Sequence, residues 1–203
     1  MYTLEKMNKL SNSTEIDKQI WLQNNFQVYA VSNTNGNPDG LLTSYYEPEF
    51  NASRTAKNGY EVSAFDYSES GQQKALMLAQ EHGISINYIV SDVLELPYEN
   101  ESFDALVLIF AHFPAEIRKQ ANLKLLELLK PEGKILFEAF SKEQLNYTSG
   151  GPKDVDMLFS EEEVRNEFPG ISFDSLSTEK IVLDEGLFHQ GEGVVVRFVG
   201  TKK

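Results

Sequence analysis

The chain has 203 residues, of which 41% are hydrophobic and 24% charged, which predicts one globular domain with a substantial core. Its formal net charge of −13 would repel a polyanion on average, so we expect no nucleic-acid partner. The absence of cysteine excludes disulfides, thiolate metal sites and a cysteine nucleophile.

The sequence shows no feature of a targeted or membrane protein. Residues 1–10 lack the apolar core of a signal peptide. The longest apolar stretch, 105–113, is far shorter than the roughly 20 residues that a membrane helix needs. We therefore expect a cytoplasmic protein without a membrane partner, and a single domain over residues 1–203.

The first quarter of the chain is hard to assign. Residues 1–25 form an N-terminal extension with a helix expected at 14–25, and 26–58 form a divergent first strand and loop. Two segments compete for the first strand, namely 26–32 (FQVYAVS) and 41–46, and the sequence leaves both open. A short helix is expected at 51–58.

From residue 59 onward, strands and helices alternate with short connections. This alternation predicts an α/β fold with three layers, in which helices cover both faces of a mostly parallel, Rossmann-like sheet. Gly83 and Pro114 mark a helix end and a helix start. The expected strands are 60–66, 84–90, 103–110 and 134–140, with helices at 70–82 and after Pro114 to Leu128, and with a break at 130–133.

The pattern changes after residue 140. A polar loop, 146–156, precedes a short helix that starts with a capping box at Ser160 and ends near Phe168. Two strands, 171–182 and 194–200, then resemble a hairpin and predict an antiparallel edge on the sheet. The loop at 150–153 (GGPK) lies near the expected cleft, as either a lid or a connector.

Two acids lie at the ends of predicted strands, where ligands bind in open α/β sheets. The carboxylate of Asp66 can accept hydrogen bonds from both hydroxyls of a ribose, or it can cap the next helix. Asp92 can accept a hydrogen bond from an adenine amino group, or it can shape a turn. A glycine-rich loop normally precedes such an acid, yet no glycine lies between Gly40 and Gly59.

Two of the histidines are candidates for chemistry. His112 follows an apolar strand and is either a base or substrate contact, or a packed side chain with satisfied hydrogen bonds. His189 lies in a turn with Glu185, but two ligands on a loop are too few to indicate a metal site. We expect no metal.

Several separate blocks of the sequence agree, in order and spacing, with one family. They are 59–71 (GYEVSAFDYSESG), 91–93 (SDV), 103–114 (FDALVLIFAHFP), 130–140 (KPEGKILFEAF), 146–154 (NYTSGGPKD) and 184–193 (DEGLFHQGEG). Over about residues 51–203 the chain resembles a class I S-adenosylmethionine-dependent methyltransferase. More narrowly, it resembles the small bacterial group related to the tellurite-resistance methyltransferases.

The resemblance implies a seven-stranded sheet whose last strand is antiparallel, with S-adenosylmethionine lying across the strand tips and S-adenosylhomocysteine as product. It also implies roles for individual side chains. Asp66 would hold the ribose with Tyr67 beside it, Ser91, Asp92 and Val93 would surround the adenine, Phe110 and Ala111 would pass under the methionine portion, and His112, Tyr147 and His189 would face the substrate.

The glycine turn of the family is replaced. At 43–50 (TSYYEPEF) the chain has bulky residues and a proline, while in the other register 33–36 (NTNG) would serve as a substitute loop. Two functions therefore stay open: a methyltransferase that acts on a small molecule by direct methyl transfer, or a non-catalytic methyltransferase-like protein that has lost the cofactor loop. A nicotinamide-dependent enzyme is a weaker third interpretation, because that fold also needs the glycine turn.

Overall fold

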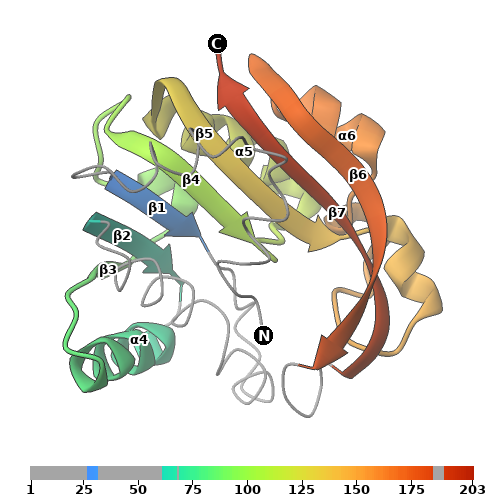
Figure 1. The fold of residues 1–203 in the computed structure, drawn as a ribbon, viewed down its shortest axis with the longest axis horizontal. Helices are drawn as coiled ribbons and strands as arrows, with labels where there is room; N and C mark the ends of the chain where they lie inside the picture. Colours follow the sequence, from blue (N-terminus) through green and yellow to red (C-terminus); the bar gives the residue numbers. More distant parts are fainter. Residues whose placement is uncertain (1–26, 32–60, 68, 185–189) are drawn as a thin grey trace, which may run out of the picture.

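The computed structural model describes residues 27–31, 61–67, 69–184 and 190–203 (Figure 1). They form a seven-stranded sheet in the order β3-β2-β1-β4-β5-β7-β6. Strands β1 to β5 are parallel, and β7 runs antiparallel to both of its neighbours. The predicted mostly parallel sheet with an antiparallel C-terminal strand is confirmed. The strands are β1 Gln27–Val31, β2 Glu61–Asp66, β3 Asn87–Val90, β4 Phe103–Ile109, β5 Leu129–Phe140, β6 Ile171–Asp184 and β7 Gln190–Lys202.

The central strand β1 resolves the ambiguity about the first strand. Ala30 pairs with Ala64 of β2 on one side and with Val107 of β4 on the other. The candidate at 26–32 therefore supplies the strand between β2 and β4, and the candidate at 41–46 lies outside the described residues. Residues 1–26 and 32–60 lie outside the described residues, together with the helices expected at 14–25 and 51–58 and both candidate loops.

The helices lie close to their predicted positions. They are α4 Glu69–Glu81, α5 Ala115–Leu128 and α6 Glu161–Glu167, with short 3₁₀ turns η2 Val93–Glu95, η3 Lys142–Asn146 and η4 Val155–Met157. After α4, Gly83 adopts a φ of 64° and its N–H donates to the carbonyl of Gln80, as expected of a glycine at a helix end. The capping box at Ser160 is present, since Ser160 and Glu163 bond each other's backbone N–H.

The sheet is buried on both faces. On one face, Phe137 of β5 packs with Leu125 of α5 and with Phe168 at the end of α6. On the other face, Val62 of β2 packs with Ala75 and the rest of the apolar side of α4. Strand β4 contributes to both clusters, which explains its nearly continuous apolar sequence. The three-layer arrangement in Figure 1 follows from this division.

The segment 130–133 partly corrects the sequence prediction. Helix α5 ends at Leu128 as expected, but β5 already starts at Leu129 instead of at residue 134. Phe103 pairs with Leu129 and Ala105 with Lys134, so residues 130–133 bulge out opposite a single residue of β4. A Cβ at Gly133 would lie 2.8 Å from the backbone carbonyl oxygen of Lys130, so the close approach of the backbone in this bulge favours glycine.

The hairpin of β6 and β7 extends past the end of its neighbour. Phe140, the last residue of β5, pairs with Val195, whereas β6 and β7 remain paired out to Asp184 and Gln190. Residues 180–184 and 190–194 therefore project beyond the carboxyl edge of the parallel strands, as Figure 1 shows. We call this part the projecting hairpin.

Candidate functional site

The carboxyl ends of β1, β2, β3 and β4 meet at one edge of the sheet. Phe65 pairs with Val31, and Asp66 pairs with Val90, so these strands end at nearly the same level. Leu108 pairs with Val31 on the other side. The residues that follow these strands are therefore neighbours in space, which is the usual site of ligand binding in such sheets.

Asp66 is the last residue of β2 and is only 1% exposed. Its backbone carbonyl accepts the N–H of Ser91 at 3.1 Å, which joins the tips of β2 and β3. The next residue, Tyr67, is 71% exposed. The structure thus brings Asp66 and Ser91 together, with Tyr67 on the adjacent surface.

Asp92 opens the turn after β3. Its Oδ1 accepts the N–H of Leu94 at 2.8 Å, so the turn-forming role considered from the sequence is present. The carboxylate has a second oxygen, and the side chain is half-buried. Val93 is buried directly after it, so a polar and an apolar group adjoin at this tip.

A tight turn follows β4. The N–H of Phe110 donates to the carbonyl of Glu138 at 2.7 Å, and the N–H of His112 donates back to the carbonyl of Phe110 at 2.9 Å, around Ala111. Phe110 has a φ of 52°, which is uncommon for a non-glycine residue and costs roughly 1–3 kcal/mol. Its ring stacks on Phe140 with centroids 4.6 Å apart. Surrounding contacts therefore stabilise a strained backbone at this edge.

His112 is 4% exposed and hydrogen bonded through both ring nitrogens. Nδ1 lies 2.9 Å from the carbonyl oxygen of Met157, and Nε2 lies 3.2 Å from the backbone N of Phe140. A carbonyl accepts and an N–H donates, so the proton sits on Nδ1. Burial lowers the pKa of His112 to about 4, so the ring is neutral near pH 7.

Of the other two residues expected to face a substrate, the structure describes one. Tyr147 follows η3 and its hydroxyl is hydrogen bonded to Lys180 of the projecting hairpin. This bond raises the pKa of the exposed Lys180, and Tyr147 and Glu192 also do so through charge. His189, like Glu185, lies outside the described residues.

The loop with Gly150 and Gly151 is anchored to the sheet. Gly151 has a φ of 86°, and a Cβ there would meet the Phe140 ring at 2.8 Å, so the loop lies against that ring. Gln144 Nε2 donates to Ser149 Oγ at 3.0 Å and to the Gly150 carbonyl at 3.1 Å. These contacts favour the connector interpretation of this loop.

The same segment also completes the edge of β7 beyond the end of β5. The N–H of Val194 donates to Gln144 Oε1 at 2.8 Å, and the Ser149 hydroxyl donates to the carbonyl of Glu192 at 2.6 Å. Ser141 contributes its backbone N–H to the Val194 carbonyl at 2.9 Å. Side chains thus replace the missing strand, which fixes the projecting hairpin beside the site.

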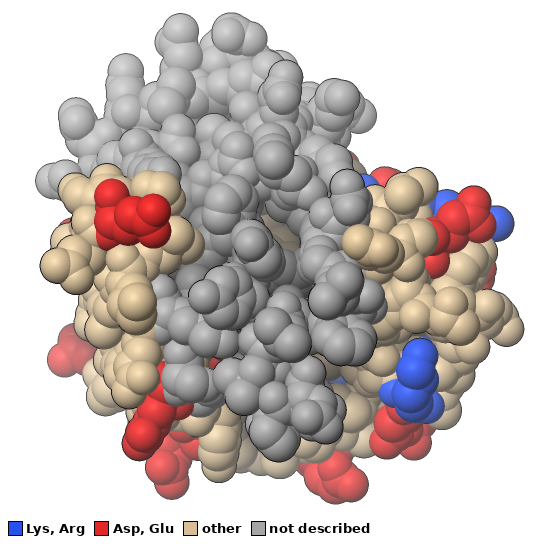
Figure 2. Space-filling model, turned by 90° about the horizontal axis from the view of Figure 1, so that it is seen from below, with Lys and Arg blue, Asp and Glu red and all other residues tan. Residues whose placement is uncertain are grey.

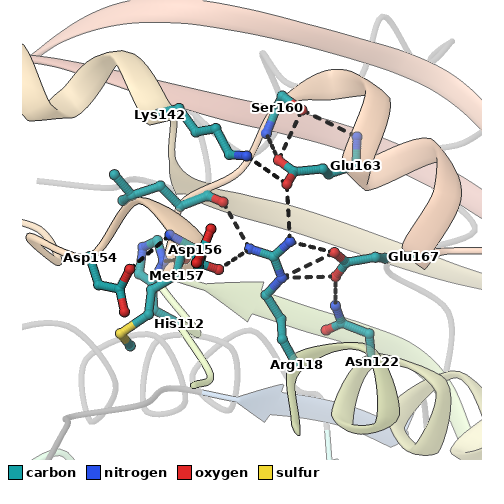
Figure 3. A network of polar contacts seen from close by, with 11 residues as sticks. His112, Arg118, Asn122, Lys142, Asp154, Asp156, Met157, Ser160, Glu163 and Glu167 are labelled. Atoms are coloured by element: carbon teal, nitrogen blue, oxygen red, sulfur yellow. Dashed lines mark hydrogen bonds and ion pairs between the residues drawn. The ribbon is translucent and has the colours of Figure 1, made fainter. Parts of the chain in front are cut away.

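Sequence reasoning missed Arg118, whose guanidinium is the centre of the network in Figure 3. It donates to the carbonyls of Asp156 and Leu158 at 2.6 and 2.8 Å and to Glu167 Oε1 through Nε at 3.0 Å. Asn122 also donates to Glu167, at 2.8 Å. No local pattern indicates this role, because an arginine in a helix of mixed polarity usually faces solvent.

The described surface carries further information. Seen from below, most of it is uncharged, and the charged side chains are more often acidic than basic (Figure 2). Within the described ranges, no three His, Asp or Glu side chains are grouped to hold a metal ion. None of the described helices has the length and apolar character needed to cross a membrane.

Comparisons with known proteins agree with this geometry. Residues 50–133 match a family model described as a methyltransferase domain. A ubiquinone biosynthesis O-methyltransferase of Rickettsia canadensis (strain McKiel) is 28% identical over 99 residues, which are 49% of this chain and 42% of that protein. The chain thus spans less than half the length of this curated relative.

Solved structures show the same fold at low identity. A SAM-dependent methyltransferase from Methanosarcina mazei has a TM-score of 0.65 at 14% identity, covering 95% of this chain and 99% of that one. TehB from Haemophilus influenzae has a TM-score of 0.64 at 16% identity, covering 98% and 65%. Residues 50–133 are thus similar to a methyltransferase domain, and the fold of the chain is the one found in S-adenosylmethionine-dependent methyltransferases.

Proposed function

We propose that this protein transfers a methyl group directly from S-adenosylmethionine to a small molecule. The observation that carries the proposal is the shared edge of β1 to β4, where Asp66, the Ser91–Val93 turn and the Phe110–His112 turn lie together. This strand order and this edge are where a Rossmann-like sheet binds a nucleoside.

The chemistry of the groups at this edge fits an adenosyl ligand. The carboxylate of Asp66 suits the two hydroxyls of a ribose, and hydrogen bonds to a charged acceptor contribute roughly 1.5–3 kcal/mol each. Asp92 retains a second carboxylate oxygen for an adenine amino group, with Val93 as an apolar neighbour. Phe110 and Ala111 would pass under the methionine portion.

The remaining work of the protein is alignment. S-adenosylmethionine supplies a methyl carbon that is already activated by the sulfonium. The protein therefore needs to hold the acceptor in line with that carbon and to exclude water, and positioning of this kind is worth roughly 7–11 kcal/mol. Phe140, Gly151 and the projecting hairpin with Tyr147 would form the acceptor side.

A small-molecule acceptor is supported by the name of one relative, a ubiquinone biosynthesis O-methyltransferase. The formal net charge of −13 also suits a small acceptor better than a nucleic acid. These observations support an acceptor of small size.

Calorimetry with S-adenosylhomocysteine tests the proposal. We expect binding by the wild type and at least about tenfold weaker binding by Asp66→Ala, because the ribose loses its carboxylate acceptor. Asp174→Ala is the matched control, since this exposed aspartate pairs with Lys134 away from the strand tips.

Two results would contradict the proposal. No heat of binding at millimolar S-adenosylhomocysteine would favour the non-catalytic alternative, in which the cofactor loop has been lost. Equal affinities of Asp66→Ala and Asp174→Ala would show that any binding takes place elsewhere.

A further inference from the structure

His112 connects three segments that are distant in sequence. Its ring accepts the N–H of Phe140 at the tip of β5 and donates to the carbonyl of Met157 in η4. Its own backbone N–H closes the turn onto Phe110 at the tip of β4. The ring also stacks on Phe140 with centroids 5.7 Å apart. One buried side chain thus fixes β4, β5 and η4 relative to one another.

The acceptor carbonyl of Met157 is itself held in place. The carbonyls on either side of it, those of Asp156 and Leu158, both accept from Nη1 of Arg118, so three consecutive carbonyls are bound (Figure 3). Arg118 is in turn held by Glu167. The Met157 carbonyl to which His112 donates is therefore held in place by its neighbours.

This arrangement stabilises a turn that would not form readily by itself. Phe110 has a positive φ without being glycine, and the turn around Ala111 contains no glycine. Backbone strain of this kind persists only where the surroundings over-determine it. The hydrogen bonds of His112 supply part of that determination.

We propose that His112 is a positioning residue of this methyltransferase, which holds the Phe110–His112 turn in the shape that binds the cofactor. The inference rests on the proposed function, because it assigns the turn to the methionine portion of the cofactor. His112 would act through the backbone of Phe110 and Ala111, and not by taking a proton from the acceptor.

The hydrogen-bond geometry separates this role from that of a base. A general base needs a ring nitrogen within reach of the acceptor, and both ring nitrogens of His112 are engaged with backbone groups. The charged group that faces the ring is Arg118, which opposes a second positive charge nearby. Burial has the same effect on protonation.

Three substitutions distinguish the two roles. His112→Asn retains a donor near the position of Nδ1, and His112→Gln retains an acceptor near the position of Nε2, whereas His112→Phe keeps the ring and loses both bonds. None of the three side chains can take a proton at neutral pH. A base would therefore be lost equally in all three variants, while a positioning residue would be partly rescued by the amides.

The first measurement is the affinity for S-adenosylhomocysteine by calorimetry, which needs no acceptor. We expect affinity about tenfold weaker in His112→Phe, and about threefold weaker or less in His112→Asn and His112→Gln. Val199→Ala is the control for general destabilisation, because this buried residue lies opposite Leu136 in β5, well before the strand tips. We expect it to leave the affinity unchanged.

The second measurement is amide hydrogen exchange of Phe140, which requires no ligand and so tests the support even if the proposed function fails. We expect lost protection in His112→Phe and retained protection in His112→Gln. Unchanged affinity in all three variants of a wild type that binds, or unchanged exchange at Phe140 in His112→Phe, would overturn the proposal. A wild type that does not bind would instead contradict the proposed function.

Discussion

The two halves of the carboxyl edge are built differently. At the tips of β2 and β3, the described polar groups are two acids and a serine, and the turn is closed by short-range bonds such as that from Leu94 to Asp92. At the tips of β4 and β5, side chains from α5, η3 and the following loop bond to backbone groups that are distant in sequence. In the proposed function the first half would present groups to a ligand, whereas the second half is a packed support.

This contrast between the two halves bears on how each of them tolerates substitutions. A turn closed by local bonds, such as the one that Asp92 forms with Leu94, depends little on distant segments of the chain. The half near β5 depends on several segments at once, so one substitution there affects all of them. Three predictions test this contrast, in order of expected effect.

The largest effect is expected for Arg118→Met. Removal of the guanidinium leaves the buried carboxylate of Glu167 without its charged partner and two carbonyls without a donor. Breaking a buried ion pair in this way destabilises by about 3–5 kcal/mol. Urea unfolding measures the loss, with Lys119→Met on the exposed side of α5 as the control. Similar losses of unfolding free energy in Arg118→Met and Lys119→Met would contradict the supporting role given to Arg118.

The second prediction concerns acid. The pKa of His112 is about 4 in the folded chain and near 6.5 when unfolded, so between these values only the unfolded chain binds the proton. This contribution to stability is complete above pH 6.5 and is lost as the pH falls toward 4. Between pH 7.5 and 5.0 we expect the free energy of unfolding to decrease by about 2 kcal/mol more in the wild type than in His112→Gln. Parallel pH curves for the two proteins would contradict this.

The smallest effect is expected for Gly151→Ala. Its φ of 86° is strained for alanine, and the new Cβ would lie 2.8 Å from the Phe140 ring. We expect a loss of about 1–2 kcal/mol in thermal or urea unfolding. Gly83→Ala, with a φ of 64° and no atom within 4 Å of the new Cβ, should lose less. Equal losses of unfolding free energy in the two variants would show that the close contact with the Phe140 ring does not affect stability.

The sequence predicted most of the fold because its periodicity reflects burial. The apolar strand at 103–110 and the alternation that follows it were sufficient to predict the sheet and its antiparallel edge. The first strand was ambiguous because 26–32 and 41–46 have similar composition, and only pairing with β2 and β4 distinguishes them. The early start of β5 was missed because Pro131 and Gly133 also fit an ordinary loop.

The candidate site was predicted less completely, for a physical reason. Asp66 and Asp92 could be identified because a strand end is a local property of the sequence. The partners of His112 and Arg118 lie on segments more than 25 residues away, and most of them are backbone groups that every residue possesses. A sequence pattern of side-chain types cannot indicate a hydrogen bond whose acceptor is a backbone carbonyl.

The side chains that complete the edge of β7 have a consequence for the behaviour of the protein in solution. A strand that outruns its neighbour exposes a row of N–H and carbonyl groups, which is a template for pairing with another chain. Gln144 and Ser149 occupy this stretch of β7 with their own hydrogen bonds. The projecting hairpin can therefore reach past the sheet without offering this inner edge for self-association between copies of the protein.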